Sequence, residues 1–392
     1  MRFNLWEDCN RVPLTELLSF IVDNRGKTVP TAPSGHKLIA TNCVTNNTLF
    51  PVYDKIRYLS EETYQTWFRA HPIPGDILFV NKGTPGRVCL VPDPVDFCIA
   101  QDMIALRADE SKIYPKYLFT VLRSREIQQQ IYNTNVGDVI PHFKKQFLDQ
   151  LLIPIPERSI QESIGDLYYV LSLKAERNKK INDNLADLLQ TIYQERFGND
   201  ILAVNQGVLS DICSYSRDKV AVSELNVRTY FSTENMLSGK AGSTEATSLP
   251  TTSQTTACHK GDTLISNIRP YFKKIVYCED KCGCSTDVLC FTPSQPCYSA
   301  YLFSTLYADK FFAFMVAGSK GTKMPRGDKQ QIMTYPVVLP SEEELAGFNT
   351  IASPLLEQIY SNRAENKRLS ILRDTLLPKL MSGEIDVSAV QL

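Results

Sequence analysis

Short apolar runs separated by turn residues fill the front of each half of the chain. Residues 76–91 form one such pattern, in which the loop 81–86 contains two glycines and a proline. Residues 262–278 repeat the pattern around the loop 267–274. Apolar runs bounded by Gly and Pro predict strand, loop and strand. The helices predicted to follow are 117–124 and 301–308. Each front is therefore expected to be an α+β domain dominated by short strands.

The back of each half carries a long heptad pattern. Apolar residues recur at intervals of three and four from Ile164 to Ile192, and again from Phe348 to Leu376. A pattern sustained for about four heptads is typical of a coiled coil, and a polar Asn within it fixes the register. We therefore predict that the two helices pack on one another as an antiparallel coiled coil; a helical hairpin that serves only as a core is the alternative. The predicted seam residues are Leu171, Asn178, Leu185, Leu188, Leu355, Asn362, Leu369 and Leu372.

The two halves of the chain resemble each other. From Tyr117 onward the matching residues are separated by a constant 184 positions, as for Tyr117 with Tyr301 and Leu188 with Leu372. The earlier pairs drift, so that Gly75 matches Gly261 at a separation of 186. A fixed back suggests a shared mechanical part, and a variable front suggests a surface adapted to different targets. Two copies of an ordinary domain whose loops differ in length are the alternative.

These patterns predict the fold class and its divisions. The class is α+β with an internal pseudo-two-fold repeat, in which each mixed α/β domain is followed by a strand and a long helix. The predicted divisions are residues 1–150 for the first domain, 151–200 for the first strand and helix, 201–334 for the second domain, and 335–392 for the second strand, helix and C-terminal segment.

Composition narrows the range of functions. Hydrophobic residues make up 43% of the 392 residues, which is enough to build cores, and the net charge is −1. A protein that coats nucleic acid over its whole surface is expected to be basic, so this charge argues against that class. A nucleic-acid-binding protein that focuses its positive charge in clefts remains compatible with this net charge. The 11 cysteines are scattered, and we find no signal peptide or membrane span, so we expect free thiols and a cytoplasmic protein.

The C-terminal segment 376–385, Leu-Leu-Pro-Lys-Leu-Met-Ser-Gly-Glu-Ile, resembles the closing segment of the specificity subunits of type I restriction-modification systems. The strand-to-helix entries at 153–156 and 337–344 are similar to those of the same family, as are the Gly-Asp elements at Gly75 and Gly261. The resemblance covers the whole chain in order. It implies two target-recognition domains that each read one half of a split DNA site, held at a fixed separation by the helices.

The same resemblance implies the partners. Two methyltransferase subunits dock along the helices, and two motor-nuclease subunits join them in the full complex. S-adenosylmethionine, ATP and Mg²⁺ belong to those subunits, and this chain is expected to bind no cofactor and no membrane.

A helix over 157–197 would be about 60 Å long at about 1.5 Å per residue. That length exceeds one turn of B-DNA, which is about 34–36 Å.

The candidate DNA contacts lie in loops that leave rigid strands. Phosphates require cations, and base edges require hydrogen-bond donors and acceptors. The candidates in the first pair of loops are Asn81, Lys82, Thr84, Arg87, Asn267, Arg269, Tyr271, Lys273 and Lys274. A second pair of loops, 137–145 and 318–326, adds His142, Lys144, Lys145, Lys320, Lys323 and Arg326. Exposed polar loops without a partner are the alternative.

Motifs for catalysis are missing from the sequence. There is no Gly-x-Gly-x-x-Gly after a strand and no Asn-Pro-Pro-Tyr-like tetrapeptide of the kind expected in an adenine methyltransferase. The cysteines between Cys278 and Cys290 lack the two CxxC pairs of a zinc site, and the four histidines are isolated. We therefore predict a non-enzymatic recognition subunit with no catalytic or metal-binding residue. A structural adaptor that dimerises partners through the helical hairpin, without reading DNA, is the alternative.

Overall fold

The computed structural model describes residues 4–24, 26, 28–134, 141–198 and 206–385. The chain forms two compact units. Unit 1 consists of Met1–Lys179 with Ala364–Leu392, and unit 2 consists of Lys180–Arg363. Each unit therefore contains one mixed α/β domain and part of each long helix. The four-part division proposed from the sequence stays a prediction.

Unit 1 is built on three sheets within its described residues. Its strands are β1 (Asn10–Pro13), β2 (Leu18–Val22), β3 (His36–Ile39), β4 (Arg57–Leu59), β5 (Ile77–Val80), β6 (Val88–Leu90), β7 (Phe97–Ile99), β8 (Met103–Ala108) and β9 (Leu152–Ile155). The largest sheet has the order β2-β8-β5-β6, a second has the order β4-β3-β7, and β1 pairs with β9. All of these pairs are antiparallel except β3 with β7.

Unit 2 repeats this plan with changes in its second sheet. Its strands are β10 (Gln206–Val208), β11 (Cys213–Tyr215), β12 (Lys219–Ala221), β13 (Tyr230–Phe231), β14 (Gln254–Cys258), β15 (Thr263–Ser266), β16 (Ile275–Tyr277), β17 (Cys282–Cys284), β18 (Val288–Pro293) and β19 (Pro336–Val338). The order β11-β18-β15-β16 repeats the large sheet of unit 1, and β10-β19 repeats β1-β9. The second sheet, β12-β14-β17-β13, keeps the parallel pair but places β14 and β12 on the other side of β17. The variable front predicted from the sequence lies here.

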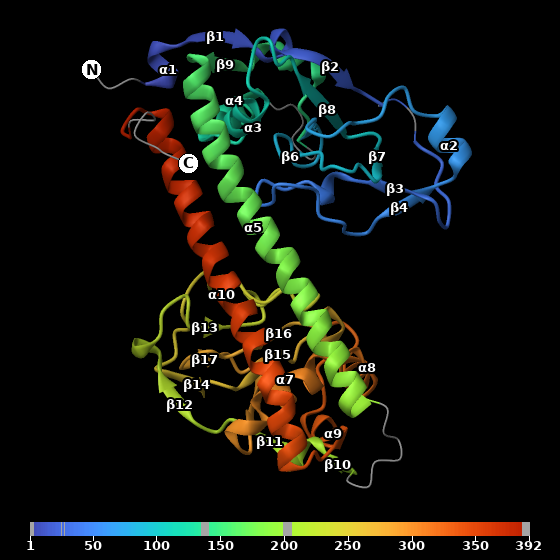
Figure 1. Cartoon of the computed structure of the whole chain (residues 1–392), viewed down its shortest axis with the longest axis vertical. Coiled ribbons are helices and arrows are strands. Elements are labelled where there is room, and N and C mark those ends of the chain that lie inside the picture. The colour runs from blue at the N-terminus through green and yellow to red at the C-terminus, as the bar shows by residue number, and fades with distance from the viewer. Residues whose placement is uncertain (1–3, 25, 27, 135–140, 199–205, 386–392) are drawn as a thin grey trace. The chain divides into compact units, whose positions relative to one another are not determined.

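Ten α-helices complete the described part of the chain. They are α1 (Leu5–Asp8), α2 (Glu61–Thr66), α3 (Pro115–Leu122), α4 (Arg125–Thr134), α5 (Arg158–Tyr193), α6 (Leu209–Ile212), α7 (Ser299–Tyr307), α8 (Asp309–Ala317), α9 (Lys329–Met333) and α10 (Glu342–Met381). The long helices α5 and α10 follow β9 and β19 and are drawn in green and red in Figure 1. None of the described helices is long and apolar enough to cross a membrane. The predicted fold class, with a long helix after each domain, is confirmed.

The beginning of α10 shows why the helix starts where it does. The side chain of Ser341 accepts a hydrogen bond from the backbone N–H of Glu344 at 3.3 Å, and the Glu344 carboxylate accepts one from the backbone N–H of Ser341 at 2.8 Å. This reciprocal arrangement is a capping box, which satisfies two of the backbone donors left free at a helix start. The run Ser-Glu-Glu-Glu therefore acts as a start signal.

Repeated Gly-Asp pairs form the turn before the central strand of each large sheet. Gly75 and Gly261 have φ angles of +86° and +92°, a backbone conformation that favours glycine. The buried carboxylates of Asp76 and Asp262 each accept a hydrogen bond from the backbone N–H three residues earlier, at 2.9 and 2.8 Å. The pairs therefore belong to the scaffold that positions β5 and β15.

The long helices contribute to the core of each unit. In unit 1, Ile164 of α5 and Leu377 of α10 belong to the same buried cluster as Tyr117 of α3. In unit 2, Leu189 of α5 and Phe348 of α10 join the cluster around Tyr301, Phe291 and neighbouring side chains. Burial of these side chains fixes each helix segment to its own domain.

Two asparagine pairs join the helices by the same hydrogen bond. In unit 1, the side-chain amide of Asn178 donates to Asn366 at 2.9 Å, and in unit 2 that of Asn362 donates to Asn182 at 2.9 Å. Each residue of the first pair is 184 positions from its counterpart in the second, with the two helices exchanged. A second contact in each unit, Tyr168 with Arg373 in unit 1 and Tyr193 with Phe348 in unit 2, shows that residue numbers rise along α5 as they fall along α10, so the segments are antiparallel in each unit.

The predicted seam requires a correction at two positions. Leu188 and Leu372 are 47% and 45% exposed, whereas the next residues, Leu189 and Arg373, are buried. A straight α-helix has 3.6 residues per turn, so a strict seven-residue pattern drifts by about 20° per heptad. The row of buried side chains on each helix is therefore displaced by one residue, from Leu188 to Leu189 and from Leu372 to Arg373. The other predicted leucines, Leu171, Leu185, Leu355 and Leu369, are half-buried.

Nine of the cysteines are buried and all eleven are free thiols. Several gather in one apolar cluster of unit 2, namely Cys258, Cys278, Cys282, Cys284 and Cys290. Among the described residues, no group of His, Cys, Asp and Glu side chains is placed to hold a metal ion. These thiols pack as small hydrophobic side chains between the two sheets of their domain.

Candidate nucleic-acid interface

The two loops predicted to contact DNA in the first half meet in unit 1. Lys82, in the loop after β5, forms an isolated β-bridge with His142. The N–H of Gly83 donates to the carbonyl of Pro141 at 3.0 Å, and the N–H of Phe143 donates to the carbonyl of Asn81 at 2.8 Å. Residues 137–140 of the predicted loop lie outside the described residues. The remaining part is held against the first loop by backbone hydrogen bonds.

Unit 2 brings its two loops together in the same way. Ile268 forms the equivalent bridge with Arg326. The N–H of Arg269 donates to the carbonyl of Pro325 at 2.8 Å, and the N–H of Gly327 donates to the carbonyl of Asn267 at 3.3 Å. These bonds repeat those of unit 1 at matching positions. Each unit therefore presents one surface made of two loops, which we call reading surface 1 in unit 1 and reading surface 2 in unit 2.

The two asparagines proposed as base-reading residues serve the scaffold instead. Asn81 has no exposed surface, and its side chain donates to the carbonyl of Phe143 at 3.2 Å. Asn267 is also buried, and its backbone N–H donates to the carbonyl of Asp287 at 2.8 Å. A buried side chain cannot reach a base edge, so the prediction for these two residues is wrong. They fix the first residue of each loop.

Reading surface 1 has three exposed cations. Lys82, Arg87 and Lys144 are exposed, and they form no ion pair with any described residue. Lys145 is held by Asp23, whose carboxylate lies 3.2 Å from its ammonium. The remaining two candidates, Thr84 and His142, are half-buried. The surface can therefore offer positive charge to phosphates without first breaking ion pairs.

The cations of reading surface 2 are mostly paired. The ion pairs are Lys273 with Asp309 at 3.0 Å, Lys320 with Asp328 at 2.7 Å, and Arg326 with Asp287 at 3.0 Å. Exposed ion pairs contribute little to stability, about 0–1 kcal/mol, so these cations can exchange a carboxylate for a phosphate. Lys274 donates to the carbonyl of Thr233 at 2.6 Å, and burial lowers its pKa. Lys274 is therefore a support of the loop.

Two side chains of reading surface 2 were missed by the sequence analysis. Tyr271, which was predicted, is 50% exposed; Phe272 next to it is 38% exposed, and Met324 in the second loop is 51% exposed. Phe272 adjoins Tyr271 in the 3₁₀ turn η6 (Pro270–Phe272), with 4.7 Å between the ring centroids. The signal that could have revealed them is the occurrence of apolar residues inside strongly basic loops.

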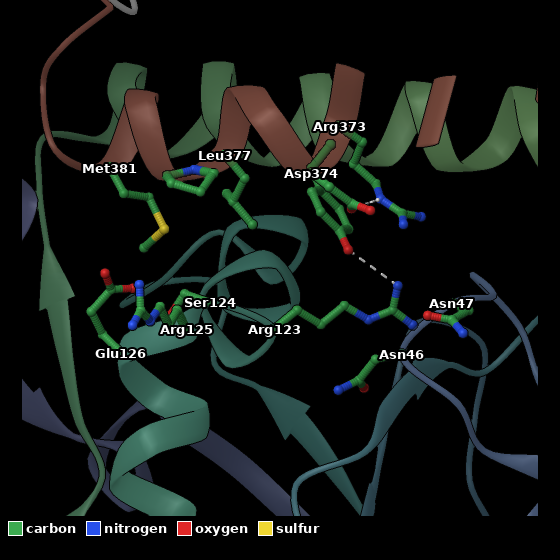
Figure 2. Close-up of a pocket in the computed structure, with 12 residues that line it drawn as sticks. Asn46, Asn47, Arg123, Ser124, Arg125, Glu126, Arg373, Asp374, Leu377 and Met381 are labelled. Atoms are coloured by element: carbon green, nitrogen blue, oxygen red, sulfur yellow. Dashed lines mark hydrogen bonds and ion pairs between the residues drawn. The ribbon is translucent and has the colours of Figure 1, made fainter. Parts of the chain in front are cut away.

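A pocket of about 300 Å³ in unit 1 lies between the end of α10 and the turn that joins α3 to α4 (Figure 2). Arg373 and Asp374 line it from α10, and Arg123 extends below them. The guanidinium of Arg123 donates to the carbonyls of Thr45 and Val88 at 3.2 and 2.7 Å. Arg123 therefore anchors a loop and a strand end of the domain close to α10.

Comparison with known proteins gives a consistent picture. Residues 19–196 match the family described as type I restriction modification DNA specificity domain. This part of the chain, somewhat less than half of it, is therefore similar to that family. The specificity subunit of the type I restriction enzyme MjaIX from Methanocaldococcus jannaschii is 34% identical over 73 residues, which are 19% of this chain and 17% of that protein. The specificity subunit of the HindI enzyme from Haemophilus influenzae is 24% identical over 153 residues, which are 38% of this chain and 33% of that protein.

The fold of the chain has a solved counterpart. The S subunit of a type I restriction-modification system from M. genitalium is 17% identical to the chain, with a TM-score of 0.62. The likeness covers 97% of this chain and 98% of that one. At this identity the likeness concerns the fold. It extends over both repeats, including the half beyond residue 196 that the family match does not reach.

Exposed apolar side chains on the long helices complete the candidate sites. In unit 1 they are Val170, Ile371 and Leu372, and in unit 2 they are Ile181, Leu188 and Ile351. Contiguous exposed apolar patches mark surfaces on which another protein can pack, and these side chains are the candidates for such a contact on the helices. The exposed side chains of the helices therefore differ in chemical kind from those of the basic reading surfaces.

Proposed function

We propose that this chain is the DNA-recognition subunit of a type I restriction-modification complex and that it reads a bipartite site. Each unit reads one half of the site through its own reading surface. The chain itself performs no catalysis. The observation that carries the proposal is the recurrence of the same two-loop surface, closed by the same backbone hydrogen bonds, in both units. Cations on each surface suit phosphate contact.

Two methyltransferase subunits are proposed to dock along α5 and α10, and motor-nuclease subunits to join the full complex. The exposed apolar side chains of both helices support a protein contact there. S-adenosylmethionine, ATP and Mg²⁺ are proposed to bind to those partners. In this arrangement the chain recognises the DNA sequence, and the partners carry out the catalysis.

Selection from random DNA tests the proposal. The chain, purified together with its methyltransferase partner, is mixed with random duplexes, and the bound fraction is amplified and sequenced. We expect a motif of two defined parts separated by a gap of constant length. If the complex forms but enriches no motif, the chain is a structural adaptor that joins its partners without reading DNA.

A further inference from the structure

Reading surface 2 exposes apolar side chains that the described part of reading surface 1 does not. Tyr271, Phe272 and Met324 are exposed where the two loops of unit 2 meet. At the corresponding place in unit 1, Thr84 and Pro85 are half-buried. The two surfaces share their backbone hydrogen bonds, so the difference lies in the side chains that the loops carry.

The backbone on both sides of this cluster is unusual. Arg269 and Lys273 have φ angles of 51°, in the left-handed region that L residues rarely adopt. The loop of unit 1 has Gly83 and Gly86 with φ angles of 85° and 87°, and glycine adopts such angles without a steric cost. Unit 2 therefore keeps two cationic side chains at positions where glycine would be more stable. Non-glycine residues held in this way are frequent at functional sites.

Backbone hydrogen bonds and ion pairs hold the turn that carries Tyr271 and Phe272. The N–H groups of Gly239 and Lys240 donate to the carbonyls of Phe272 and Lys273 at 2.8 and 2.9 Å. The carboxylate of Asp309 lies 2.7 Å from the ammonium of Lys240 and 3.0 Å from that of Lys273. These contacts fix the turn before any ligand binds, so that little conformational entropy is lost on binding.

The surroundings of the cluster identify the chemistry of its partner. Lys323 and Arg326, in the second loop, place exposed cations beside the apolar side chains. Arg269 donates from its guanidinium to the carbonyl of Lys323 at 3.5 Å and so joins the two loops. Nucleic acid combines an anionic backbone with flat apolar base faces, and it suits a surface on which aromatic rings stand among cations.

We propose, resting on the DNA recognition proposed above, that Tyr271 and Phe272 act as an aromatic wedge. The wedge enters the base stack in the half-site bound by unit 2 and unstacks one base step. Unit 1 binds its half-site without unstacking it, because the described residues of its two loops, 81–87 and 141–145, carry no exposed aromatic side chain.

Fluorescence of 2-aminopurine tests the wedge directly. This base analogue brightens when it loses stacking, so it is placed in turn at each position of both halves of the selected site. The complex of the full chain with its methyltransferase partner is expected to raise the fluorescence several-fold at one step in one half only, apart from any target base that the methyltransferase itself extrudes. Tyr271→Ala and Phe272→Ala should abolish the rise and weaken binding about tenfold, as expected for the loss of one stacked base.

Two matched variants control the experiment. Tyr271→Phe keeps the ring and is expected to keep the rise, whereas Tyr132→Ala removes an exposed aromatic side chain of unit 1 and should change nothing. If the Arg269→Ala variant no longer protects the half-site in which the fluorescence rises, as measured by footprinting, that half-site is the one bound by unit 2. The wedge is overturned if the complex binds the site tightly without this rise in fluorescence. It is also overturned if replacing thymine by uracil weakens binding while no base loses its stacking, because the side chains would then contact the thymine methyl group instead. Those results would leave the proposed function intact, whereas a complex that binds no duplex selectively would contradict that function.

Discussion

Arg269 illustrates how a single residue can exchange stability for binding. Its φ angle of 51° is unfavourable for an L residue, with a cost of roughly 1–2 kcal/mol, and its loop counterpart in unit 1 is Gly83. Arg269→Gly is therefore expected to raise the free energy of unfolding by about 1 kcal/mol while weakening DNA binding. Urea unfolding and a binding titration of the same variant check both parts. A variant that binds as tightly as the parent would show that the guanidinium has no role in binding.

Lys82 supplies the simpler case of an exposed cation. We expect Lys82→Ala to weaken DNA binding and to reduce the dependence of binding on salt by about one phosphate contact. The melting temperature should not change, because the side chain is exposed and makes no ion pair with a described residue. A titration at several salt concentrations, with a thermal melt beside it, measures both. A large drop in melting temperature would show that the residue is structural.

The cysteines allow a test of the packing in solution. Cys297 is exposed, whereas burial and the nearby Asp8 carboxylate raise the pKa of the half-buried Cys9. Burial also raises the pKa of Cys213 to about 12. Since the thiolate is the reactive form, an alkylating agent should label Cys297 first in the native protein. Mass spectrometry of the labelled chain reads this out, with Cys297→Ser as the control that should lose the rapid label.

At this scale the sequence located the two loops of each half but not the burial of every residue in them. Asn81 and Asn267 were placed correctly at the loop starts, yet each is buried by a segment about 60 residues away, around Phe143 and Gly327. Such burial depends on tertiary contacts that a local pattern does not contain. Exposed Lys82 and Tyr271 needed no such contact, so their placement could be predicted from loop position alone.

The helix pair is the element on which the repeat depends. Asn362 donates to Asn182 in a buried position of unit 2. Asn362→Ala is expected to cost about 1–3 kcal/mol, because the amide of Asn182 is left buried without its partner. The double variant Asn182→Leu with Asn362→Leu removes both polar groups and should recover most of that loss.

Urea denaturation of the two variants and the parent measures this difference. The same change at the equivalent pair of unit 1, Asn178 with Asn366, serves as an internal replicate. If the single alanine variant were as stable as the parent, the asparagine pair would not be what sets the helix register.

The turn beneath reading surface 2 should respond to acid. Hydrogen bonds from Lys240 and Lys273 hold the pKa of Asp309 below its usual value of 3.8. A carboxylate with a lowered pKa stabilises the folded state above pH 3.8, and this contribution is lost as the pH falls through the lower folded value. We expect the amide of Lys240 to lose protection from hydrogen exchange below about pH 4, earlier than the amides of β15. Asp309→Asn should show weaker protection without that pH dependence, and an identical fall in the variant would contradict the assignment.

Helix and strand positions were predictable because they follow local patterns. The strands β9 and β19 and the starts of α5 and α10 lie where proline-bounded runs and the Ser-Glu-Glu-Glu segment place them. The side of each helix that is buried was not fully predictable. Leu188 and Leu372 fit a seven-residue repeat, but the helices bury Leu189 and Arg373 because their periodicity is 3.6 residues.

For the whole molecule, the internal repeat is the property that relates sequence to function. The repeat reappears in equivalent sheets, equivalent loop bridges and equivalent asparagine pairs, and the asparagine pairs keep the separation of 184 residues. The second sheet of each unit was not predictable, because β12 and β14 have no matching pattern in the first half. Variation is therefore concentrated in the domains, while the helices and their entries stay constant.

Mapping methylated bases across the genome of a host that carries this chain and its methyltransferase partner tests the central claim most directly. The account predicts one motif with two defined parts separated by a constant number of unspecified bases. A single continuous motif would contradict it.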